Sequence, residues 1–332
     1  MHLITPLKTA PILKPKIWGG KRLRLLGKQT ESASRIGESW EISTREGDSN
    51  IIISGAFPGK TLRDAVSQFP EEILGSRLSA SGFRELPLLV KFLDISGRIS
   101  VQVHPDSATA KRFGETESAK MEAWYILDAQ LESFIFLGCR EGVTKSSFLT
   151  ALQKGAPETC LVKMKPRKGD FLLIPPGTIH CAGGGLTIFE VSQNSDTTYR
   201  LHDWGREEPG RKLSLEKALS CVFGEEDKPR LAVTTCASRN QPQGAGASLV
   251  CKEFSLEEVK LNRSACEVKL PSFATVTVAS GSAQIRAGGA QTELSLGESA
   301  LLPASLARVQ ISANSSATLL LCRPNTPANS NR

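Results

Sequence analysis

The chain has few histidines and no closely spaced pair of cysteines, and both shortages limit its possible functions. Only four of its 332 residues are histidine, and none of its eight cysteines forms a C-x-x-C pair. This spacing argues against a zinc ribbon and against a thioredoxin-like redox site. Free thiols in a reducing compartment are the simplest interpretation.

Long apolar runs are also missing. No segment has the apolar length that a transmembrane helix needs. The opening residues, MHLITPLKTAPIL, lack the charged start and the long apolar run of a secretory signal. We therefore expect a cytoplasmic protein with no membrane partner.

The net charge of +7, from 41 basic and 34 acidic residues, indicates a mildly basic protein. Nucleic-acid binding needs such charges in a cluster. Here they are scattered, and the densest basic segment covers only residues 14–28. We expect no nucleic-acid partner and a bias toward a small anionic substrate.

Hydrophobic periodicity predicts a mainly β fold with a few short helices inserted in the N-terminal part. Helical patterns occur at four places, with Pro70 interrupting the first: residues 61–78, 106–113, 144–154 and 213–223. Strand patterns occur at residues 88–95, 99–104, 120–127, 171–174 and 186–191. From residue 249 onward, closely spaced short strands separated by turn signals are typical of a sandwich or barrel.

The length gives room for two domains, each with its own core. The segment 239–248, RNQPQGAGAS, is small and polar with Pro and Gly, which is typical of a linker. We therefore predict one domain over residues 1–238, which carries the helices, and a second over residues 249–332.

Candidate metal ligands gather around the stretch 169–200. Its pattern G-x5-P-x-G-x2-H ends at His180, after a strand that the Pro-Pro-Gly turn terminates. The pattern resembles the second motif of the cupin barrels, in which this histidine binds a metal. A lone histidine after a turn is more often solvated, so the metal interpretation needs partner ligands elsewhere.

Two predicted strands offer such partners. Gln102 and His104 are two residues apart, so they share one face of a sheet, and Lys120 and Glu122 share a face of the strand that follows. Polar pairs of this kind can equally form a solvent face, and that alternative stays open for each pair taken alone.

The second domain contains an echo of the motif. Residues 297–308 align without gaps on residues 169–180, with the glycine, the acidic residue, the apolar run and the proline in register. Arg308 takes the place of His180, and no histidine occurs after His202. We interpret this as an internal repeat whose second barrel kept the fold and binds no metal.

Several motifs, in order along residues 17–205, resemble those of the type I mannose-6-phosphate isomerases in their shorter bacterial form: WGG, GESWEIS, LPLLVKFLD, VQVHPD, K-x-E-x-WYIL, IPPGTIH and NSDTTYRLHDWGR. The resemblance implies two cupin (jelly-roll) barrels and a zinc-dependent interconversion of mannose 6-phosphate and fructose 6-phosphate. It places the metal ligands on Gln102, His104, Glu122 and His180, and an active-site arginine on Arg200. Cys181, after the last ligand, departs from the family pattern and is expected to be a packing residue.

Aldose–ketose isomerisation moves a proton between adjacent carbons through an enediol, so a base must reach both carbons. Glu190 and Lys120 are the candidates, with a salt link that orients a ligand as the simpler role for either. Arg200 suits the enediolate oxygen or a substrate clamp, and Lys91 and Ser100 are predicted to bind the phosphate. A non-catalytic sugar-phosphate-binding cupin and an iron oxygenase of the cupin type are the alternatives. A monomer or weak homodimer with one divalent ion per chain is expected.

Overall fold

The structure is a computed structural model that describes residues 5–29, 34–117, 119–206, 208, 211–224, 227–229, 236–237 and 246–325. By its internal contacts the chain divides into two units. Unit 1 comprises Met1–Pro15, Lys21–Phe92 and Ser238–Arg332, and unit 2 comprises Lys16–Gly20 and Leu93–Ala237. Two strands, β2 (Ile12–Gly20) and β7 (Leu88–Ile95), run through residues of both units.

This division differs from the sequential one that the sequence predicted. Most of the first 92 residues belong with the C-terminal part of the chain. The reason is strand pairing over long sequence distances, because β1 (Leu7–Thr9) pairs with β23 (Ser299–Leu302) and with β6 (Ile52–Ser54). Residues 239–245 of the predicted linker lie outside the described residues.

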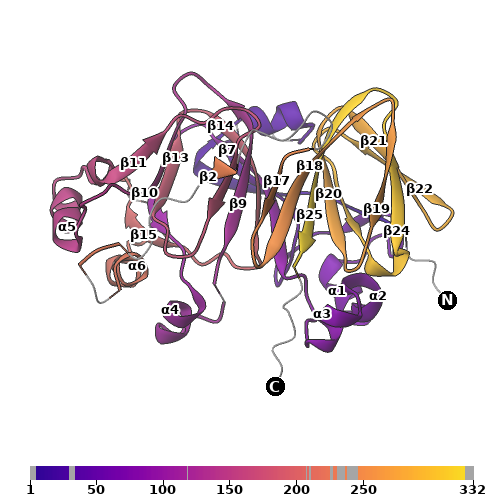
Figure 1. The fold of residues 1–332 in the computed structure, drawn as a ribbon, viewed down its shortest axis with the longest axis horizontal. Coiled ribbons are helices and arrows are strands. Elements are labelled where there is room, and N and C mark those ends of the chain that lie inside the picture. The colour runs from indigo at the N-terminus through magenta and orange to yellow at the C-terminus, as the bar shows by residue number, and fades with distance from the viewer. Residues whose placement is uncertain are drawn as a thin grey trace. The chain divides into compact units, whose positions relative to one another are not determined.

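Unit 2 is built from two antiparallel sheets (Figure 1). The first has the order β11 (Leu161–Met164), β10 (Phe134–Cys139), β13 (His180–Gly183), β8 (Val101–Val103) and β15 (Tyr199–His202). The second contains, in order, β16 (Cys236–Ala237), β12 (Phe171–Ile174), β9 (Glu122–Ala129) and β14 (Leu186–Gln193). The described residues of this unit also form three α-helices: α4 (Ser107–Arg112), α5 (Lys145–Gln153) and α6 (Leu215–Val222).

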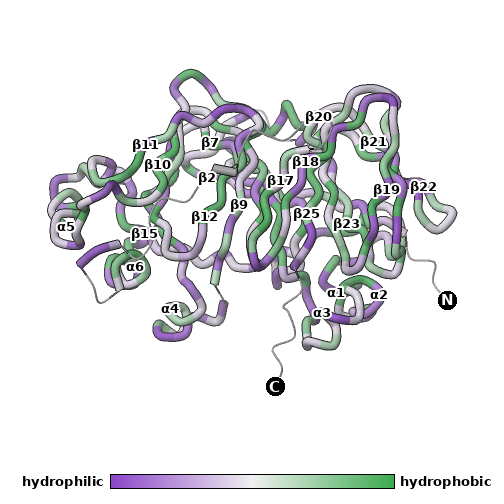
Figure 2. Tube along the Cα trace, in the orientation of Figure 1, coloured by the Kyte–Doolittle hydropathy of each residue, from purple (hydrophilic) through white to green (hydrophobic). Residues whose placement is uncertain are grey.

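A large hydrophobic cluster lies between the two sheets of unit 2. It joins inward side chains of both sheets, such as Trp124 and Ile188 from one and Val103 and Leu137 from the other, with residues of α5 and α6. Figure 2 shows the matching green stretches along β9, β10 and β12. Residues of the two sheets share one core, as in a β-sandwich, and the mainly β prediction is confirmed.

Unit 1 has a second pair of sheets. One has the order β17 (Ser248–Val250), β18 (Phe254–Asn262), β25 (Ser316–Pro324), β20 (Ala274–Ser280), β23, β1 and β6. The other has the order β19 (Ala265–Lys269), β24 (Arg308–Ser312), β21 (Ser282–Ala287) and β22 (Ala290–Ser295). A core cluster that includes Val276, Ile285, Leu294 and Leu319 connects them. Unit 1 also holds β3 (Ile36–Ile42) and the short hairpin of β4 (Thr44–Arg45) and β5 (Asp48–Ser49).

Helix starts follow the local sequence closely. Thr61 and Thr144 each accept a hydrogen bond from the backbone three residues on, and Thr144 forms a full capping box with Ser147. The single helix predicted over residues 61–78 is instead three: α1 (Leu62–Gln68), α2 (Pro70–Leu74) and α3 (Ser76–Ala80). Pro70 has no N–H to continue the first helix, and it is well suited to open the second.

The sequence echo is matched by the two sandwiches. β12 and β23 occupy the same four positions within their copies of the repeat. β13 and β24 both begin at the last position of the repeat, at His180 and Arg308. The opening glycines, Gly169 and Gly297, both have a positive φ, of 87° and 78°. His180 is fully buried, whereas the Arg308 side chain is 71% exposed and faces Glu267 at 3.8 Å.

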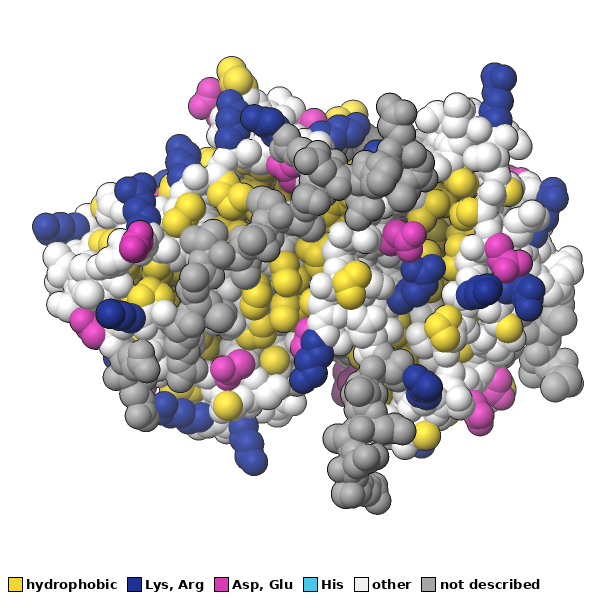
Figure 3. Space-filling view, viewed as in Figure 1, with side chains coloured by type: hydrophobic (Ala, Val, Ile, Leu, Met, Phe, Trp, Pro, Cys, Tyr) yellow, Lys and Arg dark blue, Asp and Glu magenta, His cyan; other side chains and the backbone are white. Residues whose placement is uncertain are grey.

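On the face seen in Figure 3, Lys and Arg side chains are spread among acidic and uncharged ones. No helix in the described part of the chain is long and apolar enough to cross a membrane.

Candidate functional site

Strand register in unit 2 brings three of the predicted site residues into line. β8 lies between β13 and β15, and Gln102 on β8 is the Cα partner of both His180 and Arg200. These residues are far apart in the sequence, and the antiparallel ladder alone makes them neighbours.

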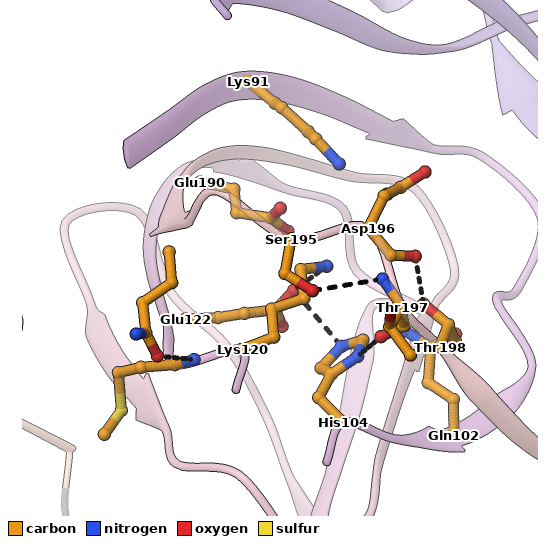
Figure 4. Close-up of polar contacts among 12 residues, drawn as sticks. Lys91, Gln102, His104, Lys120, Glu122, Glu190, Ser195, Asp196, Thr197 and Thr198 are labelled. Carbon is orange, nitrogen blue, oxygen red and sulfur yellow. Dashed lines mark hydrogen bonds and ion pairs between the residues drawn. The ribbon is translucent and has the colours of Figure 1, made fainter. Parts of the chain in front are cut away.

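A carboxylate meets two imidazoles beside this line, and Figure 4 shows Glu122 next to one of them, His104. Glu122 opens β9 in the facing sheet, and its Oε1 lies 3.2 Å from Nε2 of His104. Its Oε2 lies 3.7 Å from Nε2 of His180. All three side chains are at most 2% exposed, and one donor atom from each lies within 4.8 Å of the others. Nitrogen and oxygen donors at this spacing suit a divalent metal ion.

Backbone carbonyls fix the tautomer of both histidines. Nδ1 of His104 lies 2.8 Å from the carbonyl oxygen of Thr197, and Nδ1 of His180 lies 3.0 Å from that of Thr178. A carbonyl oxygen only accepts, so each Nδ1 carries the proton. In the neutral form of each ring, the lone pair of Nε2 then faces Glu122.

This arrangement fits a cation. Among the residues that the structure describes, Nε2 of His104 and Oε2 of Glu122 are buried without a hydrogen-bond partner. Buried polar atoms in that state are costly. Lone pairs facing each other across this short gap are stabilised when a positive charge lies between them. The donor set therefore fits a metal ion by its own chemistry.

Electrostatics favour an ionised Glu122 and a neutral His180, the protonation states in which each can bind a metal ion. Burial by itself raises the pKa of Glu122, but the positive charges of His104 and Lys120 outweigh it and hold that pKa well below its usual range. Burial, together with His104, lowers the pKa of His180 to about 4. At neutral pH the carboxylate is ionised and the His180 ring is neutral.

Gln102 completes the predicted ligand set with an amide. Its Nε2 lies 3.2 Å from Nε2 of His180, and its Oε1 accepts a hydrogen bond from the Ser100 hydroxyl at 3.0 Å. A metal would bind the amide oxygen, which exchanges places with the nitrogen on a half-turn of the terminal bond. Ser100 is 1% exposed, and its contact shown here is with Gln102 rather than with open solvent.

The two candidate bases contact different parts of the cluster. Lys120 Nζ lies 2.7 Å from Oε1 of Glu122. Glu190 is the register partner of Trp124, and its Oε2 accepts the indole N–H of that residue at 3.0 Å. The Trp124 and His180 rings pack edge to face, with centroids 5.7 Å apart. Both side chains are buried.

Lys91 lies in unit 1, and its contacts there are with Glu38, at 3.8 Å, and with the face of the Trp40 ring, 4.6 Å from its centroid. Its role in phosphate binding stays a prediction. Cys181 is fully buried, and its Sγ donates to the carbonyl of Ile99 at 3.3 Å, in keeping with a packing residue.

Thr178 and Thr197, whose carbonyls orient the two rings, are not among the site residues predicted from the sequence. A backbone carbonyl leaves no signature in residue type. The one available signal was position, because Thr178 lies inside the IPPGTIH motif and Thr197 inside NSDTTYR.

Two sandwiches of jelly-roll type, one holding a buried His–Glu–His donor set, define a cupin protein. A family model described as the catalytic domain of type I phosphomannose isomerase matches residues 7–130. A second, described as the cupin domain of mannose-6-phosphate isomerase, matches residues 247–320. The chain belongs to the type I phosphomannose isomerase family, which confirms the resemblance seen in its motifs.

Named relatives and a solved structure are similar to this chain along almost its whole length. The chain is 30% identical over 311 residues to the mannose-6-phosphate isomerase ManA of Bacillus subtilis, covering 92% of this chain and 95% of the relative. It is 31% identical over 301 residues to the mannose-6-phosphate isomerase of Streptococcus mutans, covering 90% and 92%. The crystal structure of a mannose 6-phosphate isomerase from Bacillus subtilis superposes with a TM-score of 0.81 at 27% identity, covering 96% of this chain and 99% of that one.

Proposed function

We propose that this chain is an aldose–ketose isomerase that interconverts mannose 6-phosphate and fructose 6-phosphate through an enediol intermediate. The observation that carries the proposal is the buried cluster of His104, Glu122 and His180, with donor atoms within 4.8 Å of one another. It occurs in a chain related over more than nine-tenths of its length to a named isomerase of these sugars.

The cluster would hold one divalent ion, for which zinc is the best candidate. Two imidazoles and a carboxylate, with Gln102 as a fourth ligand, form a nitrogen and oxygen donor set on rigid strands. When bound, the ion supplies a Lewis acid that polarises the sugar carbonyl and stabilises the negative oxygen that develops there. The chain itself keeps His180 neutral and Glu122 ionised for this purpose.

The proton transfer is assigned to Lys120 or Glu190. The base must reach both C1 and C2 of the sugar, and it must return the proton that it takes. Lys120 contacts Glu122 directly, whereas Glu190 is linked to the cluster through Trp124. Substrate carbon–hydrogen exchange in heavy water separates their roles. Loss of the base abolishes exchange with metal retained, whereas loss of an orienting residue weakens metal binding first.

Arg200 is assigned to the substrate oxygen. Its guanidinium is always charged and offers a planar fork of donors. Its position beside Gln102 in the ladder puts the strand that carries it next to the metal-binding strand. The group would stabilise the enediolate or hold the substrate for proton transfer.

A coupled assay that follows fructose 6-phosphate formation, with and without a chelator, tests the proposal. We expect turnover of mannose 6-phosphate that the chelator removes and a divalent ion restores. His180→Ala should lose bound metal and turnover together. His202→Ala is the matched control, because this histidine lies on β15 outside the cluster, and it should keep both.

The same experiment separates the alternatives. Full turnover in metal-free His180→Ala would refute the metal assignment. Binding of mannose 6-phosphate without turnover would indicate a non-catalytic sugar-phosphate-binding cupin. Oxygen consumption with an iron-loaded protein would indicate an oxygenase.

A further inference from the structure

The carboxylate of Glu117 holds the loop that leads into β15. Its Oε2 accepts from Oγ of Ser195 at 2.9 Å, from the backbone N–H of Asp196 at 2.7 Å, and from the N–H and Oγ1 of Thr197 at 3.1 and 3.0 Å. Successive N–H groups that converge on one anion form a nest, and hydrogen bonds to a charged acceptor are stronger than neutral ones. The partners are 78 to 80 residues apart, so this is a tertiary contact.

The loop also makes local contacts, and the backbone N–H of Ser195 donates to the carbonyl of Gln193 at 2.7 Å. Residues 195–198 belong to neither a helix nor a strand, so no backbone ladder fixes them. Within the loop, Oγ of Ser195 accepts from the Thr197 N–H at 3.3 Å, and Oγ1 of Thr198 reaches the Asp196 carbonyl at 3.5 Å (Figure 4). These two contacts are longer than those from Glu117, whose four hydrogen bonds tie the loop to a segment 78 to 80 residues away in the sequence.

Thr197 carries this attachment to the metal cluster. Its N–H and hydroxyl are bonded to Glu117, and its carbonyl accepts from Nδ1 of His104 at 2.8 Å. One residue therefore joins the carboxylate to the histidine ring. His180 has no such dependence, because the Thr178 carbonyl that orients it is only two residues away in the same turn.

We propose that Glu117 is a positioning residue for His104. By holding Thr197 it keeps the carbonyl where it binds Nδ1, and so it fixes both the ring orientation and the tautomer that turns Nε2 toward Glu122. This inference rests on the proposed metal-dependent function. Mutation of residues that orient a metal ligand without binding the metal typically weakens metal affinity by about 10- to 100-fold.

Metal affinity of the purified full chain tests the role. Zinc dissociation constants are measured by competition with a chromogenic chelator for the wild type, Glu117→Ala and Glu117→Gln. We expect Glu117→Ala to bind zinc about 10- to 100-fold more weakly. Glu117→Gln should lie between it and the wild type, because an amide oxygen accepts but carries no charge.

Glu115→Ala is the matched control. Glu115 lies on the same segment, but its carboxylate binds the Tyr199 hydroxyl at 2.8 Å and Lys217 Nζ at 2.7 Å, outside the loop. It should leave zinc affinity unchanged. Circular dichroism of each metal-free variant establishes that it is folded, and the glutamine variant serves if the alanine variant does not fold.

The tautomer of His104 is a second readout. A general loosening of the fold would affect both histidines, whereas loss of the Glu117 contact should affect His104 alone. Nitrogen-15 spectra of the metal-free protein should show His104 protonated at Nδ1 in the wild type and in Glu115→Ala, and a mixture of tautomers in Glu117→Ala. His180 should keep its Nδ1 proton in all three. Zinc affinity at the wild-type level in folded Glu117→Ala, or an unchanged His104 tautomer, would overturn the inference. A wild type that binds no metal would instead contradict the proposed function and leave the tautomer measurement to decide the role of Glu117.

Discussion

Lys28→Met removes one side of a buried ion pair in unit 1. Lys28 Nζ lies 2.7 Å from Oε2 of Glu41 and donates to the carbonyl of Gly297 at 2.6 Å. The two side chains are only 5% and 1% exposed. The other carboxylate oxygen of Glu41 accepts from Ser39 at 2.5 Å. The pair thus joins the N-terminal part of this unit to its C-terminal part.

The variant leaves a carboxylate buried without its counter-charge. Breaking a buried pair from one side costs about 3–5 kcal/mol, which is a large share of the roughly 5–15 kcal/mol of stability that a typical domain has. Replacing both partners, as in Lys28→Met with Glu41→Leu, should recover most of that loss, because no unpaired charge then remains.

The loss should depend on pH. Burial raises the pKa of Glu41, and the charge of Lys28 counteracts that rise. Without Lys28 the folded-state pKa climbs further above the unfolded value, so the folded protein binds a proton more tightly than the unfolded chain. Stability of the variant therefore increases as the pH falls through the folded-state pKa toward the unfolded one, and the deficit shrinks.

Urea unfolding at pH 7.5 and at about pH 5, followed by tryptophan fluorescence, measures both effects. Arg308→Met is the control, because Arg308 pairs with Glu267 at 3.8 Å while the two side chains remain 71% and 52% exposed, and such a pair contributes about 0–1 kcal/mol. An unchanged unfolding midpoint for Lys28→Met at pH 7.5 would refute the reasoning, as would a deficit that is equal at both pH values.

Three further outcomes are expected. Arg200→Ala should lose turnover far more than bound metal, with Arg200→Lys rescuing poorly because a point charge cannot reproduce the planar fork; loss of metal content would show a structural role. Cys181, whose pKa is raised to about 12 by burial, should resist alkylation in the folded protein, while the partly exposed Cys266 should react faster, as mass spectrometry can establish. Arg308→Ala should leave turnover nearly unchanged, since this exposed side chain has only a weak surface ion pair, and a large loss would contradict a chemically silent second barrel.

Local features of this protein follow from its sequence. Thr61 and Thr144 cap helices because a threonine hydroxyl satisfies a free N–H at a helix start, whatever lies elsewhere in the chain. The strand before Pro175 is equally local, since a short apolar run between a glycine and a proline has no room for a helix. The motif spacing around His180 suggested a metal-binding histidine that needed partner ligands elsewhere, and together with the other motifs it indicated the family.

The site itself was decided by pairing between distant strands. Gln102, His180 and Arg200 share a line only because β13, β8 and β15 are neighbours in one sheet. Likewise, most of the first 92 residues belong to unit 1 together with the C-terminal part of the chain. Strand ladders such as that of β1 with β23 join them.

The orientation of His104 shows most clearly what cannot be predicted from the sequence. Its partner is a carbonyl 93 residues away, held in turn by a glutamate 80 residues from that carbonyl. Every residue has the same backbone carbonyl, so residue type cannot reveal which one will bind the ring. Only the folded chain, which sets distances and directions among groups far apart in sequence, determines that contact.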